Sequence, residues 1–130
     1  MREKVIMKCC LLKIGLFLTL TLGGLSFAKI SDIEQNGGWY YLYDSNGKRY
    51  KTMSVSSVGE LQGFSSTFFI GKHGDWYYFF DDKGNRFLTK SVKDVGSIKS
   101  VSSKGFTSKN NGWIYTWDKK GTRTGTRPAK

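Results

Sequence analysis

The sequence predicts an all-β protein, an antiparallel meander of three hairpin repeats that forms either an open twisted sheet or a small barrel. Two observations lead to this fold class. One residue pattern recurs at a fixed spacing of 37 residues. Each copy of the pattern contains a short run of aromatic residues that ends at D-x-x-G. Aromatic residues favour strands, and this ending is typical of a hairpin turn.

The repeat is clearest at tryptophan. Trp39, Trp76 and Trp113 are 37 residues apart, and the shared core is G-x-W-[YI]-Y-x-[YFW]-D-x-x-G-x-R, in which the first glycine shifts by one position in one copy. An aspartate, a glycine and an arginine recur in step: Asp44, Asp81 and Asp118; Gly47, Gly84 and Gly121; Arg49, Arg86 and Arg123. A repeat of this length is one supersecondary unit that buries its apolar face against its neighbours.

The chain begins with the layout of a secretory signal peptide. Arg2, Lys4 and Lys8 form a basic start, residues 14–25 are almost all apolar, and Ser26-Phe27-Ala28 offers a small-residue cleavage site. We expect cleavage near Ala28 and a single domain over residues 29–130, which is secreted or held in the periplasm or cell envelope. The apolar run is shorter than the roughly 20 residues that span a membrane. An uncleaved anchor is the less favoured alternative.

The chain that remains after the predicted cleavage is basic and contains no cysteine. Cys9 and Cys10 lie in the predicted signal peptide, so the core must hold without disulfides. The remaining 102 residues carry 17 Lys and Arg against 9 Asp and Glu, a net charge of +8. A basic exported protein is attracted to polyanions such as acidic glycans, although a solvated surface accounts for most charge of this kind.

We expect hairpins near residues 39–54, 76–91 and 113–127. At D-x-x-G the aspartate accepts backbone hydrogen bonds and the glycine adopts a positive φ, which predicts a three-residue loop, Ser45-Asn46-Gly47 in the first repeat. Acidic turns also suggest calcium. One or two carboxylates per loop are too few for a calcium site, which needs six or more oxygen ligands. We therefore predict no metal site.

The loop fixes the register of each hairpin. It places Tyr43 opposite Arg49 and, continued without interruption, Trp39 opposite Met53. Alternation then separates two faces. Because unpaired charge is costly to bury, we expect the core to form on the uncharged face. It comprises Tyr40, Leu42, Tyr50 and Thr52; Tyr77, Phe79, Phe87 and Thr89; and Ile114, Thr116, Thr124 and Thr126.

The opposite face, called here the aromatic-basic face, holds the candidate ligand-binding residues. They are Trp39, Tyr41, Tyr43 and Arg49; Trp76, Tyr78, Phe80 and Arg86; and Trp113, Tyr115, Trp117 and Arg123, with Lys51, Lys90 and Arg127 beside them. Two interpretations stay open. Either the pairs of arginine and ring are cross-strand contacts that help hairpins stack, or they form a platform that binds sugar rings and anionic groups.

The segments between the hairpins are harder to interpret. An apolar residue recurs at every third position, as in Val55, Val58, Leu61 and Phe64, which matches neither strand nor helix periodicity. Glycine and serine disfavour a helix there. We predict short, irregular strands, followed by strands at Phe68-Phe69-Ile70 and Phe106-Thr107 that lead into the next hairpin.

We find no catalytic constellation in the sequence. His73 is the one histidine, it lies in a predicted loop, and it has no counterpart in the other repeats. Metal-ligand clusters and phosphate-binding glycine motifs are absent from the sequence. Asp81 and Asp82 are adjacent and point to opposite faces, so turn formation explains them better than glycoside hydrolysis. We predict that the protein is not an enzyme and has no cofactor.

The repeat resembles the WG repeats of bacterial proteins, through W-x-Y-x-x-D-x-x-G-x-R and the Val-Gly, Ser-Ser and Phe positions that follow it. It departs from them in having Tyr40, Tyr77 and Ile114 where that family has glycine, and one extra residue between Trp and Asp. This resemblance implies a β-rich repeat fold and an interaction role. A weaker likeness, through Gly38-Trp39-Tyr40-Tyr41-Leu42, is to the choline-binding and glucan-binding repeats of cell-wall proteins.

Together these observations predict an exported, non-enzymatic binding module that uses the aromatic-basic face on an acidic glycan or another envelope polyanion. The alternatives are a protein-interaction or inhibitor module and a purely structural repeat protein. The expected partners are an acidic polysaccharide or another protein rather than nucleic acid. Exposed sheet edges offer a route to self-association.

Overall fold

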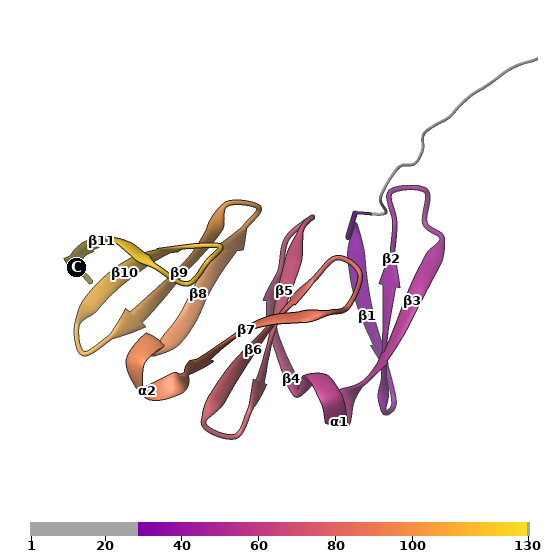
Figure 1. Cartoon of the computed structure of the whole chain (residues 1–130), viewed down its shortest axis with the longest axis horizontal. Coiled ribbons are helices and arrows are strands. Elements are labelled where there is room, and N and C mark those ends of the chain that lie inside the picture. Colours follow the sequence, from indigo (N-terminus) through magenta and orange to yellow (C-terminus); the bar gives the residue numbers. More distant parts are fainter. Residues whose placement is uncertain (1–28, 130) are drawn as a thin grey trace, which may run out of the picture.

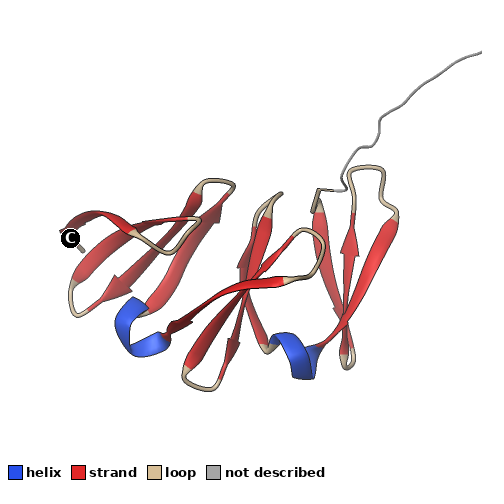
Figure 2. Ribbon diagram, in the orientation of Figure 1, coloured by secondary structure: helices blue, strands red, loops and turns tan. Residues whose placement is uncertain are grey.

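The computed structural model describes residues 29–129, so the predicted signal peptide lies outside the described residues. The described chain forms three separate antiparallel sheets, which follow one another along the long axis of the molecule (Figure 1). Strands predominate, with two single-turn helices between the sheets (Figure 2). The predicted all-β meander of repeats is confirmed in its open form. The small barrel is wrong, because none of the three sheets closes.

Each sheet is a meander of consecutive strands. Sheet A contains β1 (Asp32–Asn36), β2 (Trp39–Tyr43) and β3 (Arg49–Ser54). Sheet B contains β4 (Glu60–Phe64), β5 (Phe68–His73), β6 (Trp76–Asp81) and β7 (Arg86–Ser91). Sheet C contains β8 (Ser97–Ser102), β9 (Gly105–Asn110), β10 (Trp113–Asp118) and β11 (Arg123–Pro128). The helices α1 (Val55–Val58) and α2 (Val92–Val95) connect the sheets.

The predicted turn chemistry is confirmed in all three hairpins. Oδ1 of Asp44 accepts hydrogen bonds from the backbone N–H groups of Asn46 at 2.9 Å and Lys48 at 3.0 Å. Gly47 has a φ of 77°, a conformation that glycine adopts without steric cost. The carboxylates of Asp81 and Asp118 make the same pair of bonds. These carboxylates stabilise the loops by holding backbone donors.

The predicted register is correct at the turn and wrong beyond it. A bulge follows Arg49, so that Tyr50 has no partner on β2 and Trp39 pairs with Ser54 instead of Met53. The other two hairpins shift at the same position. A bulge adds one residue to one strand, and every later side chain on that strand changes face.

The bulge alters the predicted membership of the uncharged face. Thr52 and Thr89 pair with Tyr41 and Tyr78 and lie on the aromatic-basic face. The basic residues predicted beside the aromatic-basic face lie on the opposite face, because they pair with Leu42, Tyr77 and Ile114: Lys51, Lys90 and Arg127. Phe87, expected in the core, is 42% exposed. The assignment holds on the first strand of the first two hairpins, where the uncharged residues are buried: Tyr40 and Leu42 on β2, and Tyr77 and Phe79 on β6.

The sheets pack through their broad faces. At the A–B junction, Leu42 on the uncharged face of sheet A packs in one cluster with Phe69 and Phe80 of sheet B. At the B–C junction, the rings of Phe79 and Phe106 have centroids 5.1 Å apart. The uncharged face of each sheet therefore meets the aromatic-basic face of the next. The prediction of a single core face is wrong, because sheet B buries residues on both faces.

The segments that follow the hairpins begin with a helical turn instead of a strand. Ser54 caps α1 by accepting a hydrogen bond from the N–H of Ser57, and Val58 is buried beneath the turn. Gly59 ends the turn with a φ of 88°, and a Cβ there would lie 2.3 Å from the carbonyl oxygen of Lys72. Gly96 after α2 is equally confined. The predicted strands begin only after these glycines, at β4 and β8.

A buried tyrosine ties each of the first two hairpins to the segment that leads into the next sheet. The Tyr40 hydroxyl donates to the Gly59 carbonyl at 2.8 Å and accepts from the Leu61 N–H at 3.1 Å. The Tyr77 hydroxyl donates to the Gly96 carbonyl at 2.6 Å. Burial raises the pKa of Tyr77, and the hydrogen bond from Ile98 opposes this effect.

We predict that Tyr77→Phe lowers the free energy of unfolding by about 1–3 kcal/mol, because it leaves partly buried backbone groups without their partner. Denaturant unfolding measures the change. The matched control is Tyr115→Phe, which removes a hydroxyl that makes no hydrogen bond within the described residues. Equal losses in the two variants would contradict the role given to the Tyr77 hydroxyl.

A second tyrosine makes the A–B junction sensitive to alkaline pH. The Tyr50 hydroxyl donates to the Asp82 carbonyl at 2.7 Å. Burial, together with the nearby carboxylates of Asp82, Asp44 and Asp81, raises the pKa of Tyr50 from 10.0 to about 12. The folded protein therefore keeps a proton that the unfolded chain loses first, and the free energy of unfolding falls as pH rises through this interval.

We predict that Tyr50→Phe makes this fall between pH 10 and pH 12 shallower. Urea unfolding at several alkaline pH values measures the slope, and the absorbance change of tyrosine ionisation locates the pKa. The control is Tyr41→Phe, which removes a hydroxyl that makes no hydrogen bond within the described residues. An unaltered slope in Tyr50→Phe would show that the Tyr50 proton is not linked to folding.

Candidate functional site

Two of the predicted site residues are part of the core. Phe80 is 5% exposed and Trp117 is 7% exposed. The Trp117 indole N–H donates to the buried Ser108 hydroxyl at 2.9 Å, and its ring stacks on Phe106 with centroids 5.7 Å apart. Both rings lie between sheets, where a polymer or a partner protein has no access. Their structural role is to close the two junctions.

The arginine and tyrosine residues of the aromatic-basic face form a cation–π pair in every repeat. The guanidinium carbon of the arginine lies 4.3 to 4.6 Å from the ring centroid in the pairs Arg49–Tyr41, Arg86–Tyr78 and Arg123–Tyr115. Tyr78 and Tyr115 also pack against the core clusters at the junctions. For sheets B and C this geometry favours the stacking interpretation, and each exposed pair contributes about 0.5–1 kcal/mol.

Sheet A differs because no described sheet precedes it, so its aromatic-basic face is open. Trp39, Tyr41, Arg49 and Thr52 line a shallow hollow of about 240 Å³ on this face. A flat ring, a phenol and a guanidinium lie together there. The first repeat is thus the one place in the described chain where the predicted constellation is both assembled and accessible.

The three repeat-defining tryptophans are all about half exposed: Trp39 at 51%, Trp76 at 49% and Trp113 at 45%. Each is the first residue of its strand, directly after the tight turn that joins it to the strand before. The turns β1–β2, β5–β6 and β9–β10 lie on the lower side of the molecule in Figure 1. The tryptophans therefore form a row, with one member in each repeat. We call this the tryptophan row.

The positive charge is concentrated in the third repeat. Residues 97–129 contain seven Lys and Arg and one Asp, whereas residues 59–96 contain five of each sign and residues 29–58 contain four basic and three acidic residues. The seven basic side chains are all exposed: Lys99, Lys104, Lys109, Lys119, Lys120, Arg123 and Arg127. The net charge of the whole chain does not show this uneven distribution of positive charge, but the charges counted in each repeat do.

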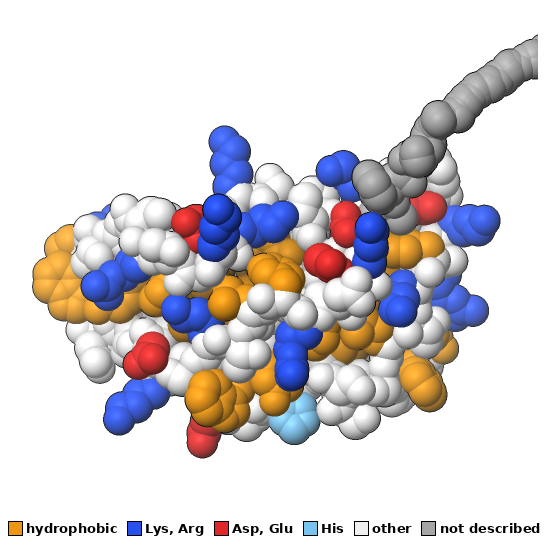
Figure 3. Space-filling model, viewed as in Figure 1, with side chains coloured by type: hydrophobic (Ala, Val, Ile, Leu, Met, Phe, Trp, Pro, Cys, Tyr) orange, Lys and Arg blue, Asp and Glu red, His pale blue; other side chains and the backbone are white. Residues whose placement is uncertain are grey.

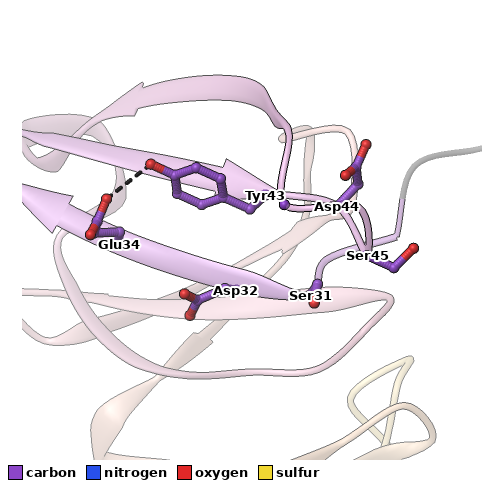
Figure 4. Close-up of a pocket in the computed structure, with 7 residues that line it drawn as sticks. Ser31, Asp32, Glu34, Tyr43, Asp44 and Ser45 are labelled. Carbon is purple, nitrogen blue, oxygen red and sulfur yellow. Dashed lines mark hydrogen bonds between the residues drawn. The ribbon is translucent and has the colours of Figure 1, made fainter.

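An acidic hollow lies at the opposite end of the stack. It encloses about 410 Å³ and is lined by Ser31, Asp32, Glu34, Tyr43, Asp44, Ser45 and Gly47 (Figure 4). The Tyr43 hydroxyl donates to the Glu34 carboxylate at 2.9 Å, and this bond raises the pKa of Tyr43. The sequence alone does not predict this hollow, because its acidic residues come from β1 and from a turn. Only the pairing of β1 with β2 brings them together.

The described residues contain no group of three or more His, Cys, Asp and Glu side chains that could hold a metal ion. Among them there is also no helix long and apolar enough to cross a membrane. His73 stacks on Tyr78 with ring centroids 5.7 Å apart, and its Nε2 lies 3.2 Å from the Ser56 carbonyl oxygen. What these surfaces offer chemically is ring stacking and charge.

Comparison with models of protein families finds no match, and comparison with curated proteins finds none either. The resemblance to WG repeats stays a prediction.

We predict that alanine distinguishes the exposed rings from the buried ones. Phe80→Ala removes a junction ring and lowers the free energy of unfolding by about 3–5 kcal/mol. Trp76→Ala, four residues away on the same strand, removes a half-exposed ring. It lowers the free energy of unfolding by about 1–2 kcal/mol, half as much as Phe80→Ala or less. Thermal and denaturant unfolding provide the comparison. A larger loss in Trp76→Ala would place the tryptophan row in the core.

Proposed function

We propose that this protein is an exported, non-enzymatic module that binds an acidic polymer, such as an acidic polysaccharide of a cell envelope. In this proposal the tryptophan row supplies stacking surfaces and the third repeat supplies positive charge. The row carries the proposal, because an exposed indole recurs at the same position of every repeat while other rings of the same hairpins are buried.

Exposure at these three positions is hard to explain by folding alone. Phe80 and Trp117 lie on the same strands as Trp76 and Trp113 and are buried at the junctions, so the fold can bury large rings. An indole with an apolar face and a polar N–H suits a ligand that is itself part apolar and part polar, as a sugar ring is. Repeated sites also suit a repeated ligand, since linked contacts raise the overall affinity.

The charge distribution supports an anionic ligand. The third repeat has a net charge of +6, from seven basic residues and one aspartate, and all seven basic side chains are exposed. Arginine binds carboxylate and sulfate groups through two parallel hydrogen bonds, and lysine binds them as a point charge. A polymer that stacks on the row would also meet the basic repeat at one end of the stack.

The arrangement of apolar surface favours a polymer over a protein partner. The core of a protein interface is a contiguous apolar patch depleted of charge. On the face of the molecule that Figure 3 shows, the hydrophobic surface is divided into separate patches among Lys and Arg side chains. A protein-interaction or inhibitor role and a purely structural role are the alternatives that the following experiment separates.

We expect polygalacturonate and dextran sulfate to bind, and neutral dextran of similar length to bind much more weakly. Calorimetry at low salt measures the affinity. Repetition at about 1 M salt, where the screening length falls to about 3 Å, is expected to weaken binding at least tenfold. Equal binding of neutral and acidic dextrans, or no binding of any of them, would overturn the proposal.

Variants assign the contacts. Trp113→Ala is expected to weaken binding by about tenfold through lost stacking. The double variant Lys104→Gln with Lys109→Gln tests the basic repeat. Its matched control is Lys72→Gln with Lys93→Gln, which removes the same charge from the second repeat. Similar effects of the two double variants would mean that net charge alone attracts the polymer.

A further inference from the structure

The two ends of the stack present the two halves of an internal junction. At the A–B and B–C junctions, the uncharged face of one sheet meets the aromatic-basic face of the next. Sheet A turns its aromatic-basic face outward at one end, and sheet C turns the opposite face outward at the other. Within the described chain neither end face has a partner sheet. The packing at the internal junctions therefore indicates what kind of surface could pack against each end face.

The B–C junction shows what occupies the position of the acidic hollow inside the stack. Lys90 reaches across from sheet B, where its Nζ donates to the Gly121 carbonyl at 2.9 Å and lies 4.8 Å from the ring centroid of Trp117. Two repeats earlier, the counterparts of Gly121 and Trp117 are Gly47 and Tyr43. Both line the 410 Å³ hollow. The hollow is therefore where a cation from a preceding sheet would lie.

The opposite end of the molecule carries such a cation. The counterpart of Lys90 in sheet C is Arg127, one repeat of 37 residues later, and its side chain is exposed. Arg127 pairs with Ile114 on β10, and Lys109 pairs with Ile114 from the other side. Two cations thus flank Ile114 on the outer face of sheet C, whereas Asp32, Glu34 and Asp44 line the hollow.

The apolar residues of the A–B junction also have counterparts on the outer faces of sheets A and C. Phe80 packs in the A–B cluster with Leu42 and Ile33. The counterpart of Phe80 in sheet A is Tyr43, which is partly exposed at the hollow. The counterparts of Leu42 and Ile33 in sheet C are threonines, which line a hollow of about 200 Å³ on the outer face: Thr116 and Thr107. A tyrosine ring facing threonines gives a more polar contact than the internal ones.

We propose that the protein associates head to tail, with the outer face of sheet C of one copy docked on the outer face of sheet A of the next. Arg127 enters the acidic hollow beside Tyr43 and the Gly47 carbonyl. Such a contact joins two different surfaces and leaves a free surface at each end, so it builds chains of copies, which stay open unless the rotation between copies closes them into a ring. It uses sheet faces, unlike the edge pairing expected from the sequence, and it is independent of the polymer proposed above.

The association is expected to be reversible and sensitive to salt. Threonines replace Leu42 and Ile33 of the A–B junction, so less apolar surface is buried. The contact then depends on opposite charges at the surface, which salt screens. Sedimentation of the protein, purified as its cells produce it and without added polymer, should show an average mass that rises with concentration at low salt and falls at about 1 M salt.

Charge reversal identifies the two surfaces. Arg127→Glu and Glu34→Lys should each weaken self-association at least about tenfold, because each places like charges across the contact. An equimolar mixture of the two variants should associate again, since each supplies the intact surface that the other lacks. Lys93→Glu and Glu60→Lys carry the same charge changes at exposed positions away from both end faces and serve as controls.

Three results would overturn the proposal. The first is a monomer at every concentration and salt tested. The second is a loss of association in the controls equal to that in the end-face variants. The third is a mixture of Arg127→Glu and Glu34→Lys that stays dissociated, which would exclude a contact between these two ends.

Discussion

The hydroxyl group of a buried tyrosine needs a hydrogen-bond partner, and in this protein that need determines how one sheet leads to the next. Tyr40 and Tyr77 point into the core and bond to the carbonyls of Gly59 and Gly96, the residues that end the two helical turns. Gly59 is in turn pressed against the backbone of Lys72. The hairpin, the turn and the first strands of the next sheet are thereby held as one unit.

This constraint decides which surfaces are open to a ligand. Because each sheet is held against the next, both faces of the middle sheet are buried. The rings of Phe80 and Trp117 therefore pack at the junctions and stabilise the fold. The surfaces left exposed include the side of the stack that carries the tryptophan row and the two ends. One end carries the acidic hollow, and the other end carries the basic third repeat. These are the surfaces to which we assign polymer binding and self-association.

Features that depend on residues close in the chain could be predicted from the sequence. Burial that depends on packing against another sheet could not. The turn at Asp44 and the inward position of Leu42 depend on residues close in the chain, so pattern and propensity identify them. The bulge at Tyr50 leaves no such signal, because a polar or aromatic residue suits either face at an edge strand. Whether Phe80 or Trp76 is buried depends on a sheet formed by other residues, although both lie on the same face of β6. The four-residue helix α1 is too short to display a helical period.

The most direct test of the stacked architecture is a measurement of proximity between side chains of adjacent sheets. In a nuclear Overhauser spectrum of the labelled protein, the ring protons of Phe79 and Phe106 should show strong cross-peaks, since their centroids are 5.1 Å apart. The indole N–H of Trp117, bonded to buried Ser108, should exchange with solvent far more slowly than that of Trp39. Absence of the Phe79–Phe106 cross-peaks, with equally rapid exchange at both indoles, would contradict the stack.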